Sequence, residues 1–292
     1  MTCQGVVKYY KPKRKVSSDF SVDNKKNYCN IMKFKWGVFC MYPILEFDPD
    51  RKALINPEDL YSVLDDAEYC VISYFREVIE KVASEYQAEI IKILKAESAD
   101  FPVYQIDYKG KKVAFVVGGV GAPLGAGLME ELIALGYRKI VACGGAGVLE
   151  QEIQCGKLVV VESAVRDEGT SYHYLEPARE IHARKDIVDV LCSTLEKHKV
   201  SYIKGKTWTT DAFFRETRAR IEKRKSEQCI MVEMEAAAFL AVAEFRNISF
   251  GEILYGGDDV SGEKWDSRSW SKRVDIRENL FWLAVECCCA IP

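Results

Sequence analysis

Short apolar segments alternate with amphipathic segments along most of this chain, and this alternation limits the fold more than any other feature. Residues 113–117 form an apolar run with the length of a buried strand, and residues 124–135 follow with helical periodicity. The same order recurs where the apolar run 229–232 precedes the helical pattern 236–245. Strands that alternate with helices assemble into layers around a parallel sheet. The sequence therefore predicts the α/β class, with one three-layer α/β/α domain and a mixed, largely parallel central sheet.

The remaining segments fit the same plan with less regular patterns. We expect further strands at 41–47, 139–143, 157–161 and 250–255, and further helices at 82–96, 186–197, 213–226 and 277–288. The type of segment 67–80 stays open because its apolar residues fit both periods. No change of composition divides residues 43–292, which we expect to form one domain. Residues 1–42 lack periodicity and are expected to be a poorly ordered N-terminal extension.

Composition places the chain among soluble globular proteins, since 48% of its residues are hydrophobic and 29% are charged. The net charge of -3 gives no electrostatic reason to expect nucleic acid as a partner. No apolar run reaches the roughly 20 residues that span a bilayer, and the N-terminus lacks the apolar core of a secretory signal. The 11 cysteines lack the paired spacing of a zinc site. We expect a cytoplasmic protein without a membrane anchor, a metal or an organic cofactor.

Three predicted strands end in glycine-rich segments, at 118–121, 144–147 and 256–257. Glycine at such a position lets backbone N–H groups come close to an anion or a flat ring. One such segment is weak support for a binding site, but three on one predicted sheet favour a shared crevice. The first segment lacks the third glycine of the dinucleotide-binding fingerprint, which excludes a Rossmann-type cofactor site.

Two carboxylates, Glu233 and Glu235, lie where the predicted strand 229–232 gives way to the helix 236–245. If the chain is extended there, a period of two places both on one side. In open α/β sheets, ligands bind in the crevice at this edge. Acids that only stabilise the start of a helix also fit this spacing and are more common. The spacing alone therefore favours an ordinary helix start over a binding site.

Six motifs, taken in order, resemble those of one enzyme family. They are Asp48-Pro49-Asp50-Arg51, Phe75-Arg76-Glu77, residues 119–123, residues 144–147, residues 166–173 and Glu233-Met234-Glu235. Their order and spacing are similar to those of nucleoside phosphorylases of the hexameric purine-nucleoside and uridine phosphorylase type, a family that also includes nucleoside hydrolases. The resemblance covers about residues 43–290 and implies the fold of that family. Phe47 departs from it, since the family has glycine at this position.

The resemblance assigns the ribose to Glu233-Met234-Glu235. A carboxylate accepts two hydrogen bonds from a cis-diol, so Glu235 would hold the ribose, with Met234 packed beside the sugar and Glu233 as a helper. The charge of Glu235 would also favour the positive charge that develops on the sugar. With this resemblance, ribose binding by Glu235 becomes the favoured interpretation over an ordinary helix start. The resemblance also places Asp259 as the acid that protonates a leaving purine, although a loop turn at Asp258-Asp259 is an equally good interpretation.

Phosphate binding is implied for two arginines and one glycine. Arg51 would bind phosphate in the same chain and Arg76 in the adjacent subunit, with Gly145 in the second glycine loop. Inorganic phosphate would then be the co-substrate, and the chain would form a homo-oligomer, either a dimer or a hexamer. However, Ala142 and Gly145 stand where phosphorylases have an arginine and a serine or threonine. Loss of one charge-assisted hydrogen bond, worth roughly 1.5–3 kcal/mol, would weaken phosphate binding ~10–100-fold.

Recognition of the base is implied for residues 209–214, where Phe213 could stack on the ring, and for Gly147. Uridine phosphorylases read the pyrimidine edge with a glutamine and an arginine that this chain lacks at the matching positions. Arg215 and Arg218 lie close enough in the sequence to substitute for them. The acid at position 259 points to a purine instead, so the choice between a uridine-like and a purine base stays open.

The predicted activity is phosphorolysis of a ribonucleoside, which gives a free base and ribose 1-phosphate. One alternative is a nucleosidase that uses water, favoured by Ala142 and Gly145. Another is a catalytically weak nucleoside-binding or sensor domain, because the fold alone does not determine function. The expected partners are a nucleoside, phosphate and further copies of the chain, rather than nucleic acid or a membrane.

Overall fold

The computed structural model describes residues 32–34, 37–39 and 42–292, and it divides the chain into two compact units, Met1–Met41 and Tyr42–Pro292. In the first unit, β1 (Met32–Phe34) and β2 (Gly37–Phe39) pair as antiparallel strands. The expected disorder of residues 1–42 concerns mostly positions outside the described ones and stays a prediction. All further description concerns the second unit.

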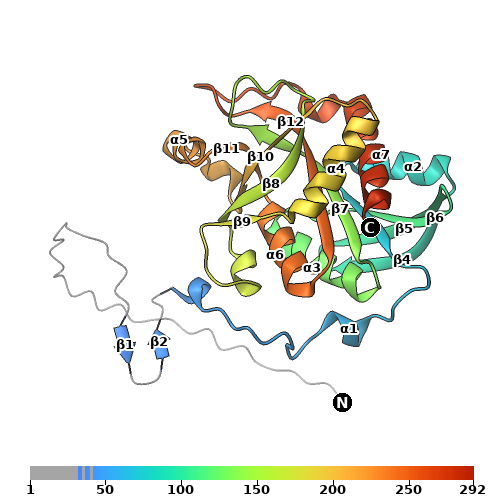
Figure 1. Cartoon of the computed structure of the whole chain (residues 1–292), viewed down its shortest axis with the longest axis horizontal. Helices are drawn as coiled ribbons and strands as arrows, with labels where there is room; N and C mark the ends of the chain where they lie inside the picture. The colour runs from blue at the N-terminus through green and yellow to red at the C-terminus, as the bar shows by residue number, and fades with distance from the viewer. Residues whose placement is uncertain (1–31, 35–36, 40–41) are drawn as a thin grey trace, which may run out of the picture. The chain divides into compact units, whose positions relative to one another are not determined.

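A mixed sheet of ten described strands forms the centre of this unit (Figure 1). Its members are β3 (Tyr69–Ser73), β4 (Glu89–Ala96), β5 (Ala99–Tyr108), β6 (Lys111–Val117), β7 (Lys139–Val148), β8 (Leu158–Asp167), β9 (Glu180–His182), β10 (Tyr202–Thr210), β11 (Cys229–Glu233) and β12 (Ser249–Asp259). The strand order is β11-β10-β8-β12-β7-β3-β6-β5-β4, with β9 paired to β8. β11 also pairs with β7, so the strands β7, β12, β8, β10 and β11 form a closed ring of paired strands. The parallel pairs are β3–β6, β3–β7, β7–β12, β8–β10 and β10–β11.

Helices cover both faces of the sheet. They are α1 (Pro57–Leu60), α2 (Arg76–Glu85), α3 (Ala122–Ala134), α4 (Lys185–Lys197), α5 (Arg218–Ser226), α6 (Ala236–Arg246) and α7 (Val274–Ala290), with short 3-10 turns η1 (Pro43–Leu45), η2 (Thr170–His173), η3 (Phe213–Arg215) and η4 (Trp270–Lys272). Successive strand residues point to opposite faces. Cys70 and Ile72 of β3 therefore pack with α3 and α6, whereas Tyr69 and Val71 pack with α2, α4 and α7. The predicted three-layer α/β/α fold with a mixed sheet is confirmed.

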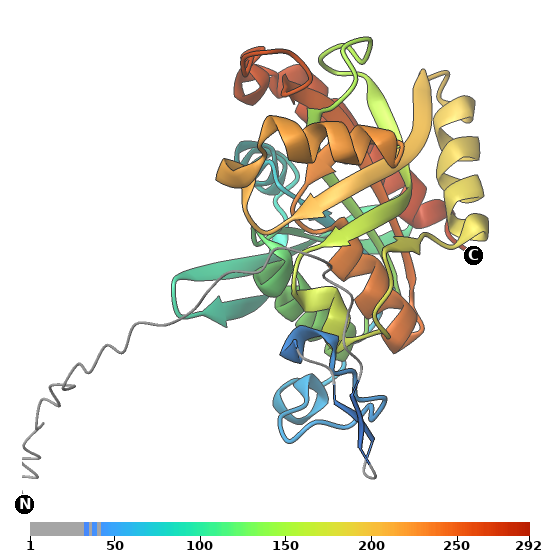
Figure 2. The same ribbon diagram turned by 90° about the vertical axis from the view of Figure 1, so that its left-hand side faces the viewer.

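The sequence prediction fails mainly at the exposed edges of the sheet. The predicted helix 82–96 is the end of α2 followed by β4, and Gln87, with a left-handed φ of 50°, lies between them. Figure 2 shows the β4–β5 hairpin, in teal, projecting from the body of the domain. The predicted strand 41–47 is the 3-10 turn η1. Strands β7 and β12 also continue through their glycines, to Val148 and Asp259, instead of ending before them.

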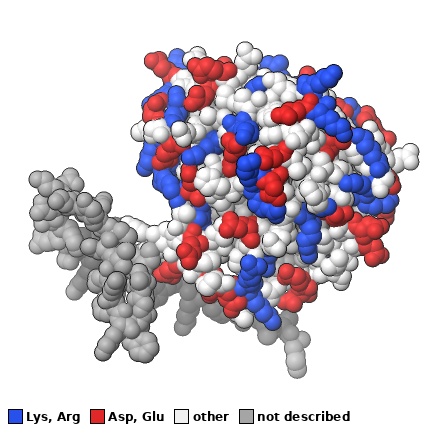
Figure 3. All heavy atoms as spheres, viewed as in Figure 1, with Lys and Arg blue, Asp and Glu red and all other residues white. Residues whose placement is uncertain are grey.

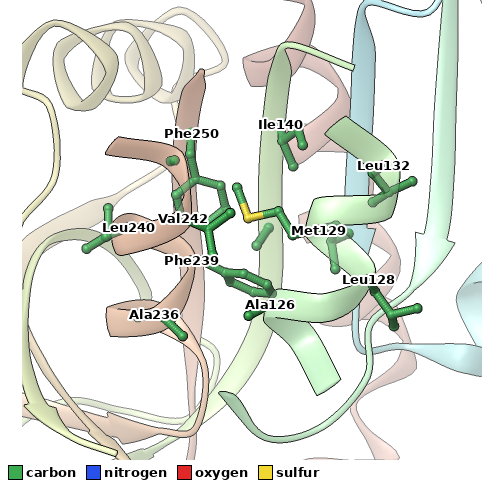
Figure 4. Packing of buried hydrophobic residues seen from close by; sticks show 14 of the residues in the cluster. Ala126, Leu128, Met129, Leu132, Ile140, Ala236, Phe239, Leu240, Val242 and Phe250 are labelled. Carbon is green, nitrogen blue, oxygen red and sulfur yellow. The ribbon is translucent and has the colours of Figure 1, made fainter. Parts of the chain in front are cut away.

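Helices α3 and α6 pack side by side against one face of the sheet, as Figure 4 shows for Ala126, Met129 and Phe239. Gly125 permits this close packing. A Cβ atom at Gly125 would lie 3.2 Å from the ring of Phe239 and 3.3 Å from Cγ of Glu235. The packing therefore brings the beginnings of the two helices together, and with them the first glycine segment and the two glutamates.

Candidate active site

The side chain of Glu233 holds the turn between β11 and α6. Its Oε2 accepts hydrogen bonds from the backbone N–H groups of Glu235 and Ala236, both at 2.6 Å. Its Oε1 accepts from the hydroxyls of Thr209 at 2.6 Å and Thr207 at 3.3 Å. Both oxygens are thus used within the protein, and the carboxylate caps the start of α6. Glu233 thus positions the turn, and its expected help in ribose binding stays a prediction.

The carboxyl group of Glu235 lies between the first turns of α3 and α6, and Glu235 is 6% exposed. Its Oε1 accepts the backbone N–H of Gly121, which precedes α3, at 2.5 Å. No hydrogen bond of complete geometry reaches its other oxygen in the described structure. Burial and the charge of Glu233 raise the pKa of Glu235 to about 8, although hydrogen bonding from the Gly121 N–H, the Met234 N–H and the Tyr74 hydroxyl opposes the rise. Met234, which precedes Glu235 in the chain, is half-buried.

A third carboxyl group, Glu252 of β12, lies near this junction and is 2% exposed. The pairing of β12 with β7 places Glu252 opposite Ala142. Burial and the charges of Glu233 and Glu235 raise the pKa of Glu252 well above its ordinary value. Oε2 of Glu252 and the hydroxyl of Tyr74 are both buried without a hydrogen-bond partner in the described structure. Sequence reasoning missed both residues, although an acid inside an apolar strand was a visible signal.

The glycine-rich segments accommodate aromatic side chains of the protein itself. A Cβ atom at Gly118 would lie 2.8 Å from the ring of Tyr74, and one at Gly144 would lie 3.2 Å from the same ring. A Cβ atom at Gly145 would lie 3.0 Å from the ring of Tyr255. Tyrosine rings thus occupy the space beside these glycines, and phosphate binding at Gly145 stays a prediction.

Neither arginine expected to bind phosphate contacts Glu235 in the described part of the chain. The guanidinium of Arg51 lies 5.4 Å from the centre of the Phe245 ring. Phe245 is in the last turn of α6 and Glu235 precedes the first, so about 15 Å of helix separates them. Phosphate binding by Arg51 stays a prediction. Arg76 begins α2, is exposed, and lies 4.0 Å from Glu80; its donation to another subunit stays a prediction.

Asp259, at the end of β12, is held as an ion pair. It accepts the backbone N–H of Ser261 at 2.7 Å and pairs with Arg268. Burial acts to raise the pKa of Asp259, but the hydrogen bonds from Ser261 and the charge of Arg268 outweigh it and lower the pKa. A carboxylate kept ionised in this way is a poor proton donor. This ion pair disfavours the expected role of Asp259 as the catalytic acid, which stays a prediction.

The neighbouring carboxylate, Asp258, faces the glycine segment of β7 instead. Its Oδ1 lies 3.7 Å from the position of a Cβ atom at Gly147, which pairs with Val232 of β11. Its Oδ2 accepts the indole N–H of Trp265 at 2.6 Å. Burial and the charge of Asp258 raise the pKa of Glu216 to about 7. Asp258 is thus the acid beside Gly147, the glycine expected on the base side, and Glu216 lies within electrostatic reach of Asp258.

The segment after β10 carries the aromatic side chains expected to contact the base. Phe213 is 52% exposed, and its ring centre lies 4.1 Å from that of Phe214. Arg215 is exposed at the end of η3. Arg218 donates hydrogen bonds to the backbone carbonyls of segment 261–262 and ties α5 to the loop after β12. Phe213 is therefore accessible to a ligand, whereas Arg218 is engaged by the loop after β12 and its expected base contact stays a prediction.

The chemical character of the site follows from these groups. Among the described residues, no set of three or more His, Cys, Asp or Glu side chains is arranged to hold a metal ion. No described helix is long and apolar enough to cross a membrane. On the face in Figure 3, basic and acidic side chains are interspersed.

Carboxyl groups, hydroxyls and aromatic rings make up the site. Such a set of groups suits a ligand that has several hydroxyl groups and a planar ring.

Proteins with a similar sequence or fold include enzymes named for nucleosides and nucleotides. A guanosine phosphorylase from Halorubrum lacusprofundi is 26% identical over 172 residues, which are 59% of this chain and 71% of the relative. The crystal structure of a uridine phosphorylase from Vibrio fischeri covers 76% of this chain and 91% of its own, with a TM-score of 0.61 and 24% identity. That of an AMP nucleosidase from Bacteroides thetaiotaomicron covers 75% and 86%, with a TM-score of 0.59 and 19% identity. At these identities the two structures establish the fold.

The match to a family model extends over most of the chain. The model of the Phosphorylase superfamily matches residues 68–278, which include the whole ten-stranded sheet and both glutamates of the strand–helix junction. The chain therefore belongs to the phosphorylase superfamily.

Proposed function

We propose that this protein cleaves the N-glycosidic bond of a ribonucleoside and releases the free base. The observation that carries the proposal is Glu235, a buried carboxyl group with one oxygen bound by Gly121 and the other without a complete hydrogen bond. In its ionised form, which is the minor form at neutral pH because the pKa is about 8, it can accept hydrogen bonds from both hydroxyls of a ribose cis-diol. The charge of this form, between two helix N-termini, stabilises the cation that develops on the sugar as the bond breaks.

On the base side, Glu216 provides the proton that a leaving base takes up. Its raised pKa, about 7, keeps a proton available at neutral pH, and the charge of Asp258, which lies beside Gly147, contributes to that rise. The exposed ring of Phe213 can stack on the base. A purine takes a proton on a ring nitrogen as it leaves, so this pair of acids favours a purine nucleoside.

The geometry favours water as the acceptor of the ribosyl group. Among the described residues, no arginine or lysine contacts Glu235 or Glu252. Phosphate beside these two carboxyl groups would lack a compensating cation, which is unfavourable in a buried site. Phosphorolysis, the first expectation from the sequence, is the second candidate. Membership of the superfamily supports it, and it requires Arg76 from another copy of the chain.

Product analysis tests both candidates. The protein is incubated with guanosine, inosine, adenosine and uridine, with and without inorganic phosphate, and bases and sugars are separated by chromatography. Release of base and ribose without phosphate is the expected result, whereas release that requires phosphate would establish the second candidate. Nucleoside binding without release would contradict both and indicate a binding domain.

A further inference from the structure

Tyr74 follows the last residue of β3 and lies between two glycine-rich segments. Its backbone N–H donates to the carbonyl of Cys143 at 3.2 Å, which holds it beside β7. Its ring fills the space that side chains at positions 118 and 144 would need, as the 2.8 Å and 3.2 Å separations from Gly118 and Gly144 indicate. The ring is therefore fixed at the carboxyl edge of the sheet, where α/β sheets bind ligands.

Two buried polar atoms near Glu235 have no partner in the described structure. The hydroxyl of Tyr74 lies close enough to act on Glu235 as a hydrogen-bond donor that lowers the pKa of that carboxyl group, but its geometry falls short of a complete hydrogen bond. Oε2 of Glu252 is also unpartnered, and the charges of Glu233 and Glu235 act on this carboxyl group. Buried polar atoms in proteins nearly always have a partner, and a small polar molecule is a common one.

We propose that Tyr74 and Glu252 form an acceptor subsite that holds one water molecule against Glu235, and that this water takes up the ribosyl group. The inference rests on the proposed N-glycosidic cleavage and adds the two residues that select the acceptor. A phenol and a protonated carboxyl group are neutral and can each donate or accept a hydrogen bond, as water requires. Phosphate is disfavoured because the ring of Tyr74 fills the space beside the glycines and no described arginine or lysine contacts Glu235 or Glu252 to compensate a dianion.

The chemical step balances without an additional reactant. The water oxygen bonds to the anomeric carbon while the carbon–nitrogen bond breaks, and the bonding electron pair leaves with the base. The reactive form is the one in which Glu235 is ionised, the minor form at neutral pH, and in it the water passes one proton to Tyr74 as the phenol passes its own proton to Glu235. The leaving base takes one proton from Glu216, and solvent carries the proton on Glu235 back to Glu216. The products are ribose and the free base.

Turnover of guanosine in ¹⁸O-labelled water, without phosphate, tests the subsite directly. The released ribose is reduced at once with borohydride to prevent exchange and is analysed by mass spectrometry. One ¹⁸O atom at the anomeric carbon is expected. Ribose 1-phosphate formed only with phosphate would overturn the inference and leave the cleavage proposal intact. Absence of base release with or without phosphate, from a protein that binds guanosine, would overturn both.

Matched variants separate a role in the reaction from a role in folding. Tyr74→Phe keeps the ring and removes the hydroxyl, so kcat should fall at least about tenfold while KM stays nearly unchanged. Tyr137→Phe is the control, because the Tyr137 hydroxyl is also buried and unpartnered but lies in the turn between α3 and β7. This control should keep the wild-type kcat. An unchanged kcat in Tyr74→Phe would overturn the inference.

Glu252 allows a rescue test of the same subsite. Glu252→Gln keeps the size of the side chain and a hydrogen-bond donor, so most of the turnover should remain. Glu252→Leu removes every polar atom and should lower kcat at least about tenfold without loss of guanosine affinity. Equal turnover in the two variants would overturn the role of Glu252.

Discussion

Replacement of Glu235 by glutamine should stabilise the ligand-free protein at neutral pH, although it removes the charge that the proposed reaction needs. The pKa of Glu235 rises from 4.5 to about 8 on folding. Between these values the unfolded chain has lost the proton and the folded protein keeps it, so the free energy of unfolding falls as pH rises. At about 1.4 kcal/mol per pH unit, the wild type loses about 3 kcal/mol by pH 7 and about 4 kcal/mol by pH 8. Glutamine does not ionise and avoids this loss.

Urea unfolding of Glu235→Gln and the wild type, followed by tryptophan fluorescence between pH 5 and pH 8, measures the effect. The stability gain of the variant should be under about 1 kcal/mol at pH 5 and increase steadily towards pH 8. Glu85→Gln is the control, since Glu85 is exposed and 3.9 Å from Lys81, and it should change stability by less than about 0.5 kcal/mol. A gain that does not vary with pH would refute the argument that burial raises the pKa of Glu235.

Three further predictions concern the neighbours of Glu235. Asp258→Asn should lower kcat for guanosine about 100-fold or more. Asp259→Asn should mainly lower the urea midpoint, because it breaks the ion pair with Arg268. Equal losses of kcat in the two variants would contradict these separate roles. Glu233→Ala should destabilise the protein by about 2 kcal/mol in urea unfolding, because two backbone N–H groups at the start of α6 lose their acceptor. Arg51→Ala should leave kcat/KM nearly unchanged with and without phosphate, and a large phosphate-dependent loss would restore Arg51 as a phosphate ligand.

Local sequence patterns predicted the parts of the fold that follow one period throughout. The buried strand β6 and the helices α3, α4, α6 and α7 were expected within a few residues of their observed ends. The hairpin of β4 and β5 was missed because one side of it is exposed, so its mixture of apolar and charged residues also matches a helical period. The register between strands cannot be derived from such patterns, and it determines which side chains share a face.

In the candidate site, too, some features could be predicted from local sequence and others required the tertiary structure. The sequence alone placed Glu233 and Glu235 where an apolar strand meets an alanine-rich helix, because that signal is local. The tertiary structure alone decided that Glu233 caps α6, that Asp258 rather than Asp259 faces Gly147, and that Glu252 lies opposite Ala142. A buried carboxyl group takes its pKa and its role from the groups around it. Those groups come from strands more than a hundred residues apart, and only the packing of α3 and α6 on the sheet brings them together.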